Sequence, residues 1–536
     1  MENTKHTDVL IVGAGPSGLM MAAQLLRHGL QPNIVDAKPG PDREPKAALV
    51  HARSLELFRQ LGQADQLLAQ GKSAYAIGLH GQRGPMDTWD FSRLVSANTA
   101  FPFIQCIGQD RVERLLLNWL AEKACPVAWE TRLESLRQDD GGATATLVHN
   151  GTRQDWQCSW VIGADGQHST LRGLLDIPLE GSGQVRHFFV ADVETQQADS
   201  RKINMFLHDK GPLAIVPLGA ADHYRIIGQL PGAHGTIQGN IRSYTDVNLQ
   251  IDSALGFRLP EERYRLISRF RCRKMVAEQL RRQRCFLIGD AAHGVSPLLS
   301  RGMNEGLYDA ANLAWKLAGV VNGRMAPSVL HTYQPERLPA VKAGSGVFEF
   351  GDSGRLWPGW LTKASRMKAI NRIGADPARL KQSFYRLAGL DVNYRHSPLS
   401  IHHALGVDIQ AGDRLPYLPV FDEKTKTQTD LHRWCEKPGF ALLVLGTISH
   451  HHLNIIGQWM RQKYPREMHL YYLPYSERNQ QVFQAFEVKP SNTKIVLIRP
   501  DMYIAYINDM LNVSLIDTYM EEILGWAFFG RSPEKH

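Results

Sequence analysis

Three glycines near the start of the chain have the spacing of a turn that holds a nucleotide phosphate. Gly13, Gly15 and Gly18 follow an apolar run, with Pro16 and Ser17 between them. In such a turn the first glycine allows a tight bend, the second lets backbone N–H groups approach a pyrophosphate, and the third lets a helix pack closely. The N-terminus of the following helix attracts the phosphates. We therefore expect a dinucleotide to bind here.

The segments on either side of this turn predict a β–α–β unit. Residues 8–12 have the apolar pattern of a strand, residues 19–28 that of a helix, and residues 32–36 that of a second strand. Asp36 ends the second strand, where its carboxylate can accept hydrogen bonds from ribose hydroxyls. The motif by itself does not distinguish NAD from FAD, and it does not specify a reaction.

Two later motifs place aspartates directly after short apolar runs. Asp165-Gly166 follows residues 160–163, and Gly289-Asp290 follows residues 285–288. An aspartate at the end of a buried strand could accept hydrogen bonds from the hydroxyls of a cofactor, and it could also cap a helix. Arg172 follows the first motif, where it could meet a phosphate, pair with Asp165 or form a purely structural ion pair.

With these motifs in this order, about residues 5–345 resemble the single-component FAD-dependent aromatic hydroxylases, which include phenol hydroxylase and the polyketide hydroxylases. The resemblance implies an α/β fold: a Rossmann-like FAD-binding domain interrupted by an antiparallel-sheet substrate domain. It implies FAD as cofactor, with NAD(P)H and O2 as co-substrates. The implied reaction is hydroxylation of a small aromatic or polycyclic substrate through a flavin hydroperoxide, which survives only where water is excluded.

The resemblance also implies roles for further residues. Gln109 matches a contact to the flavin ribityl chain, Arg53 matches an arginine near the FAD pyrophosphate, and Arg111 could neutralise the same phosphates. A helix that begins near Gly302 would direct its positive end, with the N–H groups of Met303 and Asn304, toward the negative charge of reduced flavin. Pro297 would shape the face of the flavin where oxygen reacts, although it could equally be an ordinary loop proline without that role.

The chain departs from the family pattern at the place of the substrate base. Some phenol hydroxylases carry an aspartate where this chain has Ala48. His51, His208 and Tyr224 could replace it, and each could equally be a packing or surface residue. Arg301 precedes Gly302, where it could bind an anionic substrate near the flavin edge or project into solvent.

A second glycine turn of the first kind does not occur in the sequence. We therefore expect NAD(P)H to bind transiently, reduce the flavin and leave, without a domain of its own. Three alternatives remain open: another FAD oxidoreductase such as a reductase or halogenase, an oxygenase that carries out epoxidation or Baeyer–Villiger insertion, and a flavin-binding sensor without turnover. The paired cysteines of disulfide reductases and the WxWxIP motif of flavin halogenases are both missing.

The sequence pattern suggests five segments. We expect an FAD-binding domain over 1–180 with inserted substrate strands at about 73–107, a substrate sheet over 181–270, a return to the FAD domain over 271–345, a helical linker over 346–395, and a C-terminal domain over 396–536. The last segment is similar to the thioredoxin-like tail of the phenol hydroxylase branch. Because it has no CxxC motif, we expect it to be structural or to support a homodimer.

The composition is that of a globular protein. The 536 residues are 43% hydrophobic and 21% charged, and the net charge of +8 is spread along the chain, so we expect no nucleic-acid partner. The six cysteines are scattered, which predicts no metal site and reduced thiols in a cytoplasm. We expect no membrane partner and no signal peptide, since apolar runs are short and residues 1–7 are polar.

Overall fold

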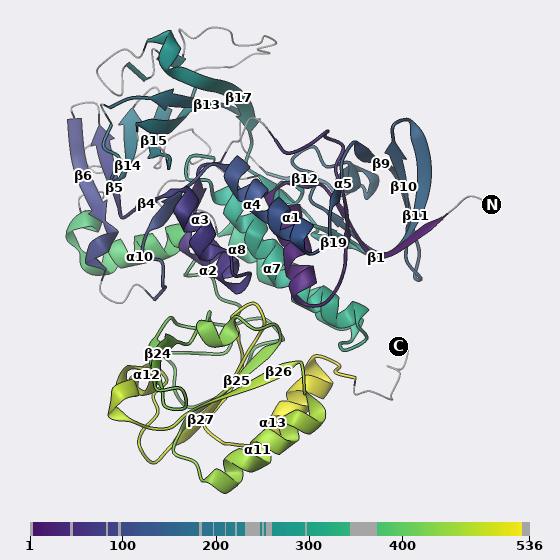
Figure 1. The fold of residues 1–536 in the computed structure, drawn as a ribbon, viewed down its shortest axis with the longest axis vertical. Helices are drawn as coiled ribbons and strands as arrows, with labels where there is room; N and C mark the ends of the chain where they lie inside the picture. The colour runs from purple at the N-terminus through teal and green to yellow at the C-terminus, as the bar shows by residue number, and fades with distance from the viewer. Residues whose placement is uncertain are drawn as a thin grey trace.

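The protein is described by a computed structural model, in which two sheets joined by helices lie above a separate C-terminal unit (Figure 1). The described residues are 4–42, 47–81, 84–94, 98–181, 185–196, 198–208, 211–219, 222–230, 247–248, 251–252, 260–294, 297–343 and 372–527. Among them no helix is long and apolar enough to cross a membrane. No cluster of three or more His, Cys, Asp or Glu side chains suited to a metal ion occurs in these ranges.

The first sheet is built around β1 (Lys5–Val12), which runs parallel to β2 (Asn33–Val35) on one side and β11 (Thr152–Gly163) on the other. β20 (Cys285–Leu287) continues the sheet in parallel beyond β11, so the chain returns to this sheet late, as the sequence predicts. The remaining strands of the sheet are β8 (Val127–Ala128), β9 (Thr131–Gln138), β10 (Ala143–His149) and β19 (Arg281–Arg282).

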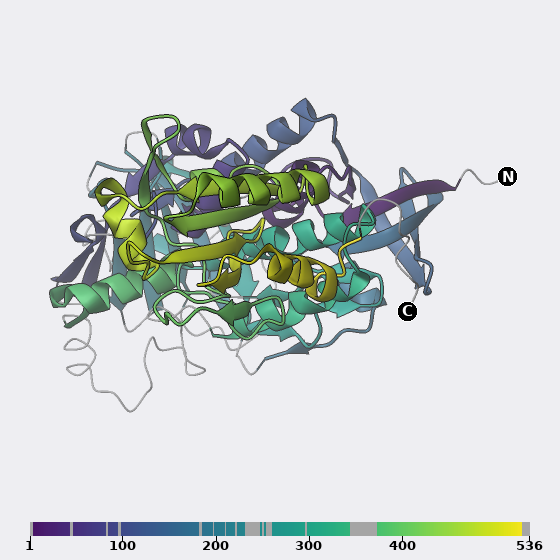
Figure 2. The ribbon, with the colours of Figure 1, turned by 90° about the horizontal axis from the view of Figure 1, so that it is seen from below.

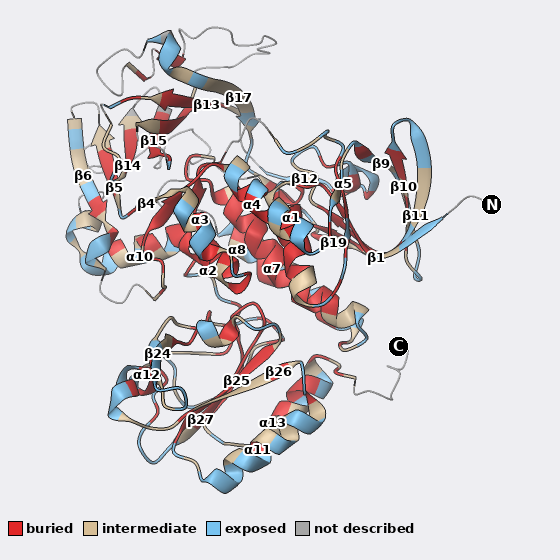
Figure 3. Ribbon diagram, in the orientation of Figure 1, coloured by how far each residue is buried: buried red, intermediate tan, exposed pale blue. Residues whose placement is uncertain are grey.

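Two helices, α1 (Pro16–Arg27) and α7 (Arg301–Val321), pack on one another beside this sheet. Figure 3 shows α7 buried along most of its length. The sequence predicts a helix that begins near Gly302, and the observed helix begins at Arg301. The other helices of the upper body are α2 (Ala52–Gln60), α3 (Ala64–Gln70), α4 (Gln109–Glu122), α5 (Thr170–Leu174), α8 (Tyr333–Lys342) and α10 (Pro377–Ala388).

The second sheet has seven strands, and the strands that the sequence pattern predicts at residues 187–193, 204–207, 213–217 and 223–229 are confirmed. Its order is β17 (Tyr264–Cys272), β13 (Arg186–Glu194), β16 (His223–Gln229), β15 (Gly211–Pro217), β14 (Ile203–His208), β5 (Ala76–Gly81) and β6 (Gly84–Asp90). The pairings among β13 to β17 are all antiparallel, as the sequence predicts, and the sheet is extended by one parallel pairing, between β14 and β5. These two strands come from distant parts of the chain, so no hairpin fixes their relative direction.

Two small three-stranded sheets complete the upper body. One contains β3 (Leu49–Val50), β7 (Ile104–Cys106) and β4 (Lys72–Ala74), and the other contains β12 (Leu179–Glu180), β18 (Met275–Ala277) and β21 (His293–Gly294). The strands expected at about 73–107 are therefore divided. β5 and β6 join the second sheet, whereas β7 pairs with β4 on one side and β3 on the other.

The C-terminal unit contains a mixed five-stranded sheet with helices beside it (Figure 2). The strand order is β22 (Ile401–His403), β28 (Ile504–Asn508), β27 (Thr493–Ile498), β25 (Phe440–Gly446) and β26 (Met468–Leu473). α11 (His450–Lys463) connects β25 to β26, α12 (Gln480–Ala485) connects β26 to β27, and α13 (Val513–Thr518) follows β28. β23 (Pro419–Asp422) and β24 (Thr427–Asp430) form a hairpin beside it.

Buried ion pairs join the C-terminal unit to the upper body. Arg499 donates two hydrogen bonds to the carboxylate of Glu336 on α8, at 2.7 and 2.9 Å, and Lys316 on α7 donates to the same carboxylate at 2.7 Å. Burial alone would raise the pKa of Glu336, but these two cations outweigh it and hold that pKa below its ordinary value. A second buried pair joins Arg414 to Glu56 on α2 at 3.0 Å.

Replacing Arg499 with alanine should strongly destabilise the protein, because the Glu336 carboxylate would lose its bidentate partner. We expect the free energy of unfolding to fall by about 3–5 kcal/mol. Arg395→Ala is the matched control, since it removes an ion pair to Asp413 in which the arginine side chain is 40% exposed, and it should cost less than about 1 kcal/mol. Chemical denaturation measures both, and equal losses would contradict the assigned role of Arg499.

Candidate functional site

A cavity of about 810 Å³ opens where the ends of the first sheet, the start of α7 and the end of β17 meet. This volume lies within the roughly 300–1,000 Å³ of typical cofactor and ligand sites. Most of the residues predicted from the three motifs line it. They are Gly13, Gly15, Pro16, Ser17, Asp36, Gln109, Asp165, Gly166, Arg172, Asp290, Pro297, Gly302 and Met303.

The glycine turn has the geometry that its spacing predicts. Gly13 has φ +107°, and a Cβ there would lie 2.3 Å from the carbonyl oxygen of Ala164. A Cβ on Gly18 would lie 2.0 Å from the Gly13 carbonyl oxygen, so this glycine allows α1 to pack closely. At Gly15 the space around an added Cβ is open within 4 Å. Gly15 caps α1 without a side-chain hydrogen bond, which leaves N–H groups at the helix start to face the cavity.

Asp36 braces the glycine turn from the neighbouring strand. One oxygen of its carboxylate accepts a hydrogen bond from the backbone N–H of Ala14 at 2.7 Å, and the other accepts from the N–H of Lys38 at 2.9 Å. The side chain is 8% exposed and lines the cavity. Its remaining lone pairs can accept hydrogen bonds from hydroxyl groups of a ligand.

Arg172 connects the two aspartate turns. Its guanidinium donates to the carbonyl oxygen of Gln167 and to that of Ala291, both at 2.9 Å. The carboxylate of Asp165 instead accepts from the Ser169 hydroxyl and from the backbone N–H of Leu171 at 3.1 Å. The hydrogen bonds of Arg172 therefore go to backbone carbonyl oxygens, and Arg172 lines the wall of the cavity.

The start of α7 forms another wall. Its N-cap residue, Ser300, has φ +53°, and its hydroxyl accepts hydrogen bonds from the N–H groups of Ala48 and Leu49, at 2.8 and 3.1 Å. The hydroxyl therefore does not cap its own helix, and the first N–H groups of α7 lie beside the cavity, which Gly302 and Met303 line. Such a helix end attracts negative charge.

Other predicted residues lie outside the cavity lining. Asn304 is fully buried, and its side-chain oxygen accepts from the N–H of His51 at 2.9 Å and from the Ser54 hydroxyl at 2.6 Å. Arg111 is exposed on α4. Arg53 faces the C-terminal unit, where it donates to the Asp501 carbonyl oxygen at 2.6 Å. Gly18 and Gly289 also lie behind the lining, as backbone that packs against its neighbours.

The structure does not bring the candidate catalytic side chains together. His51 is buried against the carbonyl oxygen of Leu299 at 2.9 Å, and burial followed by the charge of Arg301 lowers its pKa to about 3, so it is neutral at ordinary pH. Arg301 pairs with Glu305 at 2.9 Å instead of facing the cavity. Pro297 alone of the three lines the cavity.

The structure also gives no support to Tyr224 or His208 as the substrate base. The Tyr224 hydroxyl donates to the Ala198 carbonyl oxygen at 2.7 Å, and burial raises its pKa. The side chain of His208 lies outside the described residues.

Several lining residues were not predicted. Lys38, His168, Ser300, Arg271 and Arg273 line the cavity. His168 belongs to the Asp165 motif, so its position along the chain could have indicated it. Arg271 and Arg273 stand at the end of β17 in an alternating basic run, a pattern that is usually a solvated strand face, and only the fold shows that this end of the strand reaches the cavity.

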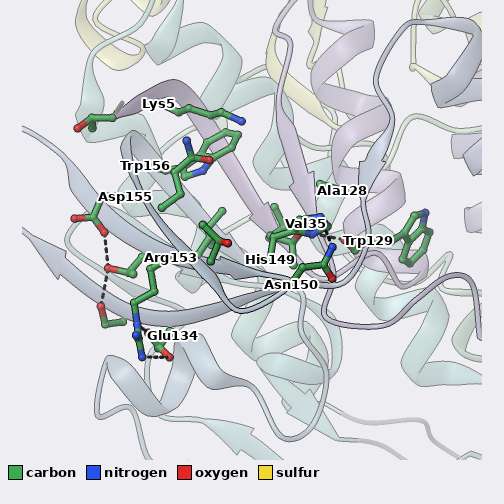
Figure 4. A pocket seen from close by; sticks show the side chains of 17 residues that line it. Lys5, Val35, Ala128, Trp129, Glu134, His149, Asn150, Arg153, Asp155 and Trp156 are labelled. Carbon is green, nitrogen blue, oxygen red and sulfur yellow. Dashed lines mark hydrogen bonds and ion pairs between the residues drawn. The ribbon is translucent and has the colours of Figure 1, made fainter. Parts of the chain in front are cut away.

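A second hollow of about 950 Å³ lies beside β9, β10 and β11 (Figure 4). None of the predicted site residues lines it. Several of its charged side chains bind one another or a neighbouring hydroxyl: Arg153 donates to Glu134 at 2.5 Å, and the Thr146 hydroxyl donates to Asp155 at 2.7 Å. The first cavity, where the motifs converge, is therefore the candidate cofactor site.

Comparison with known proteins identifies the family of the chain. The family described as "FAD binding domain" matches residues 6–345, and the one described as "Phenol hydroxylase, C-terminal dimerisation domain" matches residues 453–526. The chain belongs to the FAD-dependent aromatic and polyketide hydroxylases. Among its relatives are 6-methylpretetramide 4-monooxygenase of Streptomyces rimosus and pentachlorophenol 4-monooxygenase of Sphingobium chlorophenolicum.

The extent of these similarities is large. The first relative is 33% identical over 73% of this chain and 71% of its own length, and the second is 30% identical over 76% and 75%. The solved structure of aklavinone-11 hydroxylase in a ternary complex with FAD and aklavinone has a TM-score of 0.78, with 22% identity over 98% of this chain and 100% of that chain. At that identity the likeness shows the shared fold.

The chemistry of the cavity fits FAD. The uncapped start of α1 suits a pyrophosphate, the open space over Gly15 suits close approach to backbone, and the carboxylates of Asp36 and Asp290 suit ribose and ribityl hydroxyls. The start of α7 suits the part of the isoalloxazine ring that becomes negative on reduction.

Gly15→Val should remove FAD without unfolding the protein, because the added side chain enters open space where a pyrophosphate would lie. Losing one or two hydrogen bonds to a charged phosphate should weaken FAD binding by about a hundredfold. Gly40→Val is the control, since a Cβ there also meets open space but lies outside the cavity lining. Flavin absorbance per protein after purification checks both, and a fully yellow Gly15→Val protein would rule out the assigned role.

Proposed function

We propose that this protein is an NAD(P)H- and O2-dependent FAD monooxygenase that hydroxylates an aromatic or polycyclic substrate. One observation carries the proposal: the three motifs converge on a single cavity in a chain that belongs to this family. The relatives named above act on a polycyclic compound and on a small chlorinated phenol, and both classes are candidates. Because Ala48 is fully buried and carries no base, the substrate is one that does not require a carboxylate at this position.

The residues of the chain would hold FAD along the cavity from the glycine turn to α7. The start of α1 would bind the pyrophosphate, Asp36 the adenosine ribose, and Asp290 the ribityl chain, while Met303 and the helix start would face the pyrimidine edge of the ring. When bound, FAD supplies the redox chemistry by which electrons from NAD(P)H reach O2 and one oxygen atom enters the substrate.

The second sheet would cover the reacting region and keep water out. The face of this sheet that packs into the main core is largely apolar, with Phe188, Val190, Ile203 and Met205 at 1% exposure or less, and it also carries the buried ion pair between Arg225 and Asp192. An apolar cover over the flavin ring favours transfer of oxygen to the substrate over loss of the reactive oxygen to water.

NAD(P)H would act as a transient co-substrate. The cavity is the best candidate for its approach, because Arg271 and Arg273 line it at the end of β17, and arginine suits phosphate groups. The first β–α–β unit is then occupied by the adenosine part of FAD, which leaves the nicotinamide without a glycine turn of its own.

The C-terminal unit would be a thioredoxin-like domain. Its core strands have the order β28-β27-β25-β26, with helices between β25 and β26 and between β26 and β27, which supports this assignment. The six cysteines of the chain are all free, and only Cys435 lies in this unit. Disulfide chemistry therefore does not explain its presence, and a structural role does.

The unit would also form a homodimer, as the name of its matching family suggests. Three strongly exposed apolar side chains gather at one end of its sheet: Leu405, Val407 and Met510 are 92%, 67% and 65% exposed. They lie close together because the N–H of Leu405 donates to the carboxylate of Asp509. Exposed apolar groups of this kind mark association surfaces.

Hydroxylation is tested directly with labelled oxygen. With FAD, NAD(P)H and a panel of phenols and polycyclic aromatics, substrate should stimulate NAD(P)H oxidation, and one atom from ¹⁸O2 should appear in the product. The Gly15→Val protein is the control, because it should lack FAD. NAD(P)H oxidation that never labels a product would favour a reductase, and an unlabelled chlorinated product made with chloride present would favour a halogenase.

Dimerisation is tested by light scattering after size-exclusion chromatography. The wild-type protein should have twice the mass of the chain, and Leu405→Glu with Met510→Glu should shift it toward the monomer, because charges at an apolar interface are desolvated without partners. Lys424→Glu, on the exposed hairpin turn after β23, is the control and should leave the mass unchanged. A monomeric wild-type protein at high concentration would end this proposal.

A further inference from the structure

The short turn that carries Asp290 is held from behind by a buried side chain. The turn is a single 3-10 turn over Gly289–Ala291, and Gly289 has φ +58°. Asp290 is exposed on it and lines the cavity. A one-turn element makes few hydrogen bonds of its own, so its position depends on contacts from outside.

Asp309 supplies the principal contacts. It lies on α7, is fully buried, and is absent from the cavity lining. One oxygen of its carboxylate accepts from the backbone N–H of Gly289 at 2.9 Å and from Nε2 of His293 at 2.7 Å. These two donors stand on either side of Asp290 in the chain, so a single oxygen holds the segment from Gly289 to His293 at both ends.

The second oxygen of Asp309 is also used. It accepts from Nε of Arg337 at 2.8 Å, which anchors the carboxylate to α8. Burial alone would lower the pKa of His293, but the Asp309 carboxylate outweighs it and raises that pKa, so the contact to His293 is charge-assisted. Hydrogen bonds of this kind are shorter and stronger than neutral ones.

Two contacts restrain the turn on its other sides. Arg172 donates to the Ala291 carbonyl oxygen at 2.9 Å. The Ser17 hydroxyl fills the space beside the turn, where a Cβ on Gly289 would lie 2.3 Å from it and a Cβ on Gly306 would lie 2.0 Å from it. The turn therefore cannot shift toward α1 or α7, and its position follows that of Asp309.

We propose that Asp309 is a positioning residue for the flavin half of FAD, acting through the Gly289–His293 segment to set where the Asp290 carboxylate meets the cofactor. This inference rests on the proposed function, since it assumes that FAD occupies the cavity. The adenosine half lies with a different group of residues, the glycine turn and Asp36, which Asp309 does not contact.

That separation gives a test in which a general loss of stability and a positioning role differ. Asp309→Asn keeps the shape of the side chain but removes the charge that strengthens its hydrogen bonds to the Gly289–His293 segment. The affinity of apoprotein for FAD, from flavin fluorescence, should fall about tenfold, the effect of one weakened hydrogen bond to a charged group, while the affinity for ADP should stay within about twofold. The matched control is Glu305→Gln, on the same helix.

Glu305 is a fair control because it is also buried and also pairs with Arg337, at 2.7 Å, but its ion pairs are with Arg337 and Arg301 and not with the turn. Its FAD affinity should stay within about twofold of wild type. If Asp309→Asn does not fold, His293→Gln decides the question. It weakens the hydrogen bond between residue 293 and Asp309, and it should reduce FAD affinity about threefold with ADP affinity unchanged.

The outcomes are distinct. Unchanged FAD affinity in Asp309→Asn, or in His293→Gln where that variant decides, overturns the inference, and so does an equal loss of FAD and ADP affinity. A loss in Glu305→Gln as large as in Asp309→Asn also overturns it, since the effect would then belong to the charge of Arg337. A wild-type protein that binds ADP but not FAD contradicts the proposed function instead.

Discussion

The Glu336 carboxylate lies in the core of the chain, away from water, and it stays ionised there because Arg499 and Lys316 face it. An uncompensated charge at such a depth costs about 3–5 kcal/mol, which is a large part of the stability of a typical protein. Arg499 belongs to the C-terminal unit, Glu336 to α8 and Lys316 to α7. The charge balance of the FAD-binding body is therefore complete only when the C-terminal unit is docked against it.

The ionic contact at Glu336 is connected to the cofactor cavity by α7. The helix carries Lys316 at the ionic contact, Asp309 behind the Asp290 turn, and Met303 at the cavity wall. A helix buried along most of its length is stiff, because its side chains are close-packed on all sides. The C-terminal unit contributes no residue to the cavity lining among the described ranges. The C-terminal unit therefore affects the site by supporting α7.

The parts of the site that could be predicted from the sequence are those fixed by local geometry. The turn at Gly13, the carboxylate of Asp36 and the aspartate turns at Asp165 and Asp290 each follow a strand, and the direction of a parallel strand places its end at one edge of the sheet. The same reasoning predicted β20 and the strands of the second sheet. It did not indicate that β5 pairs in parallel with β14, because a pairing between distant segments leaves no trace in either strand.

The residues that sequence reasoning misplaced are polar side chains with distant partners. Arg53 binds the carbonyl of Asp501, and Asn304 binds His51 and Ser54. Sequence alone shows that a polar side chain needs a partner but not whether the partner is a cofactor or a distant backbone group. In this fold much of the cavity surface is backbone at glycines and helix starts, and a backbone surface has no side chains with which to hold itself in place. The polar residues behind this surface hold it in place. One motif of this family can therefore contain both a residue that would contact FAD and a residue that contacts only other parts of the protein.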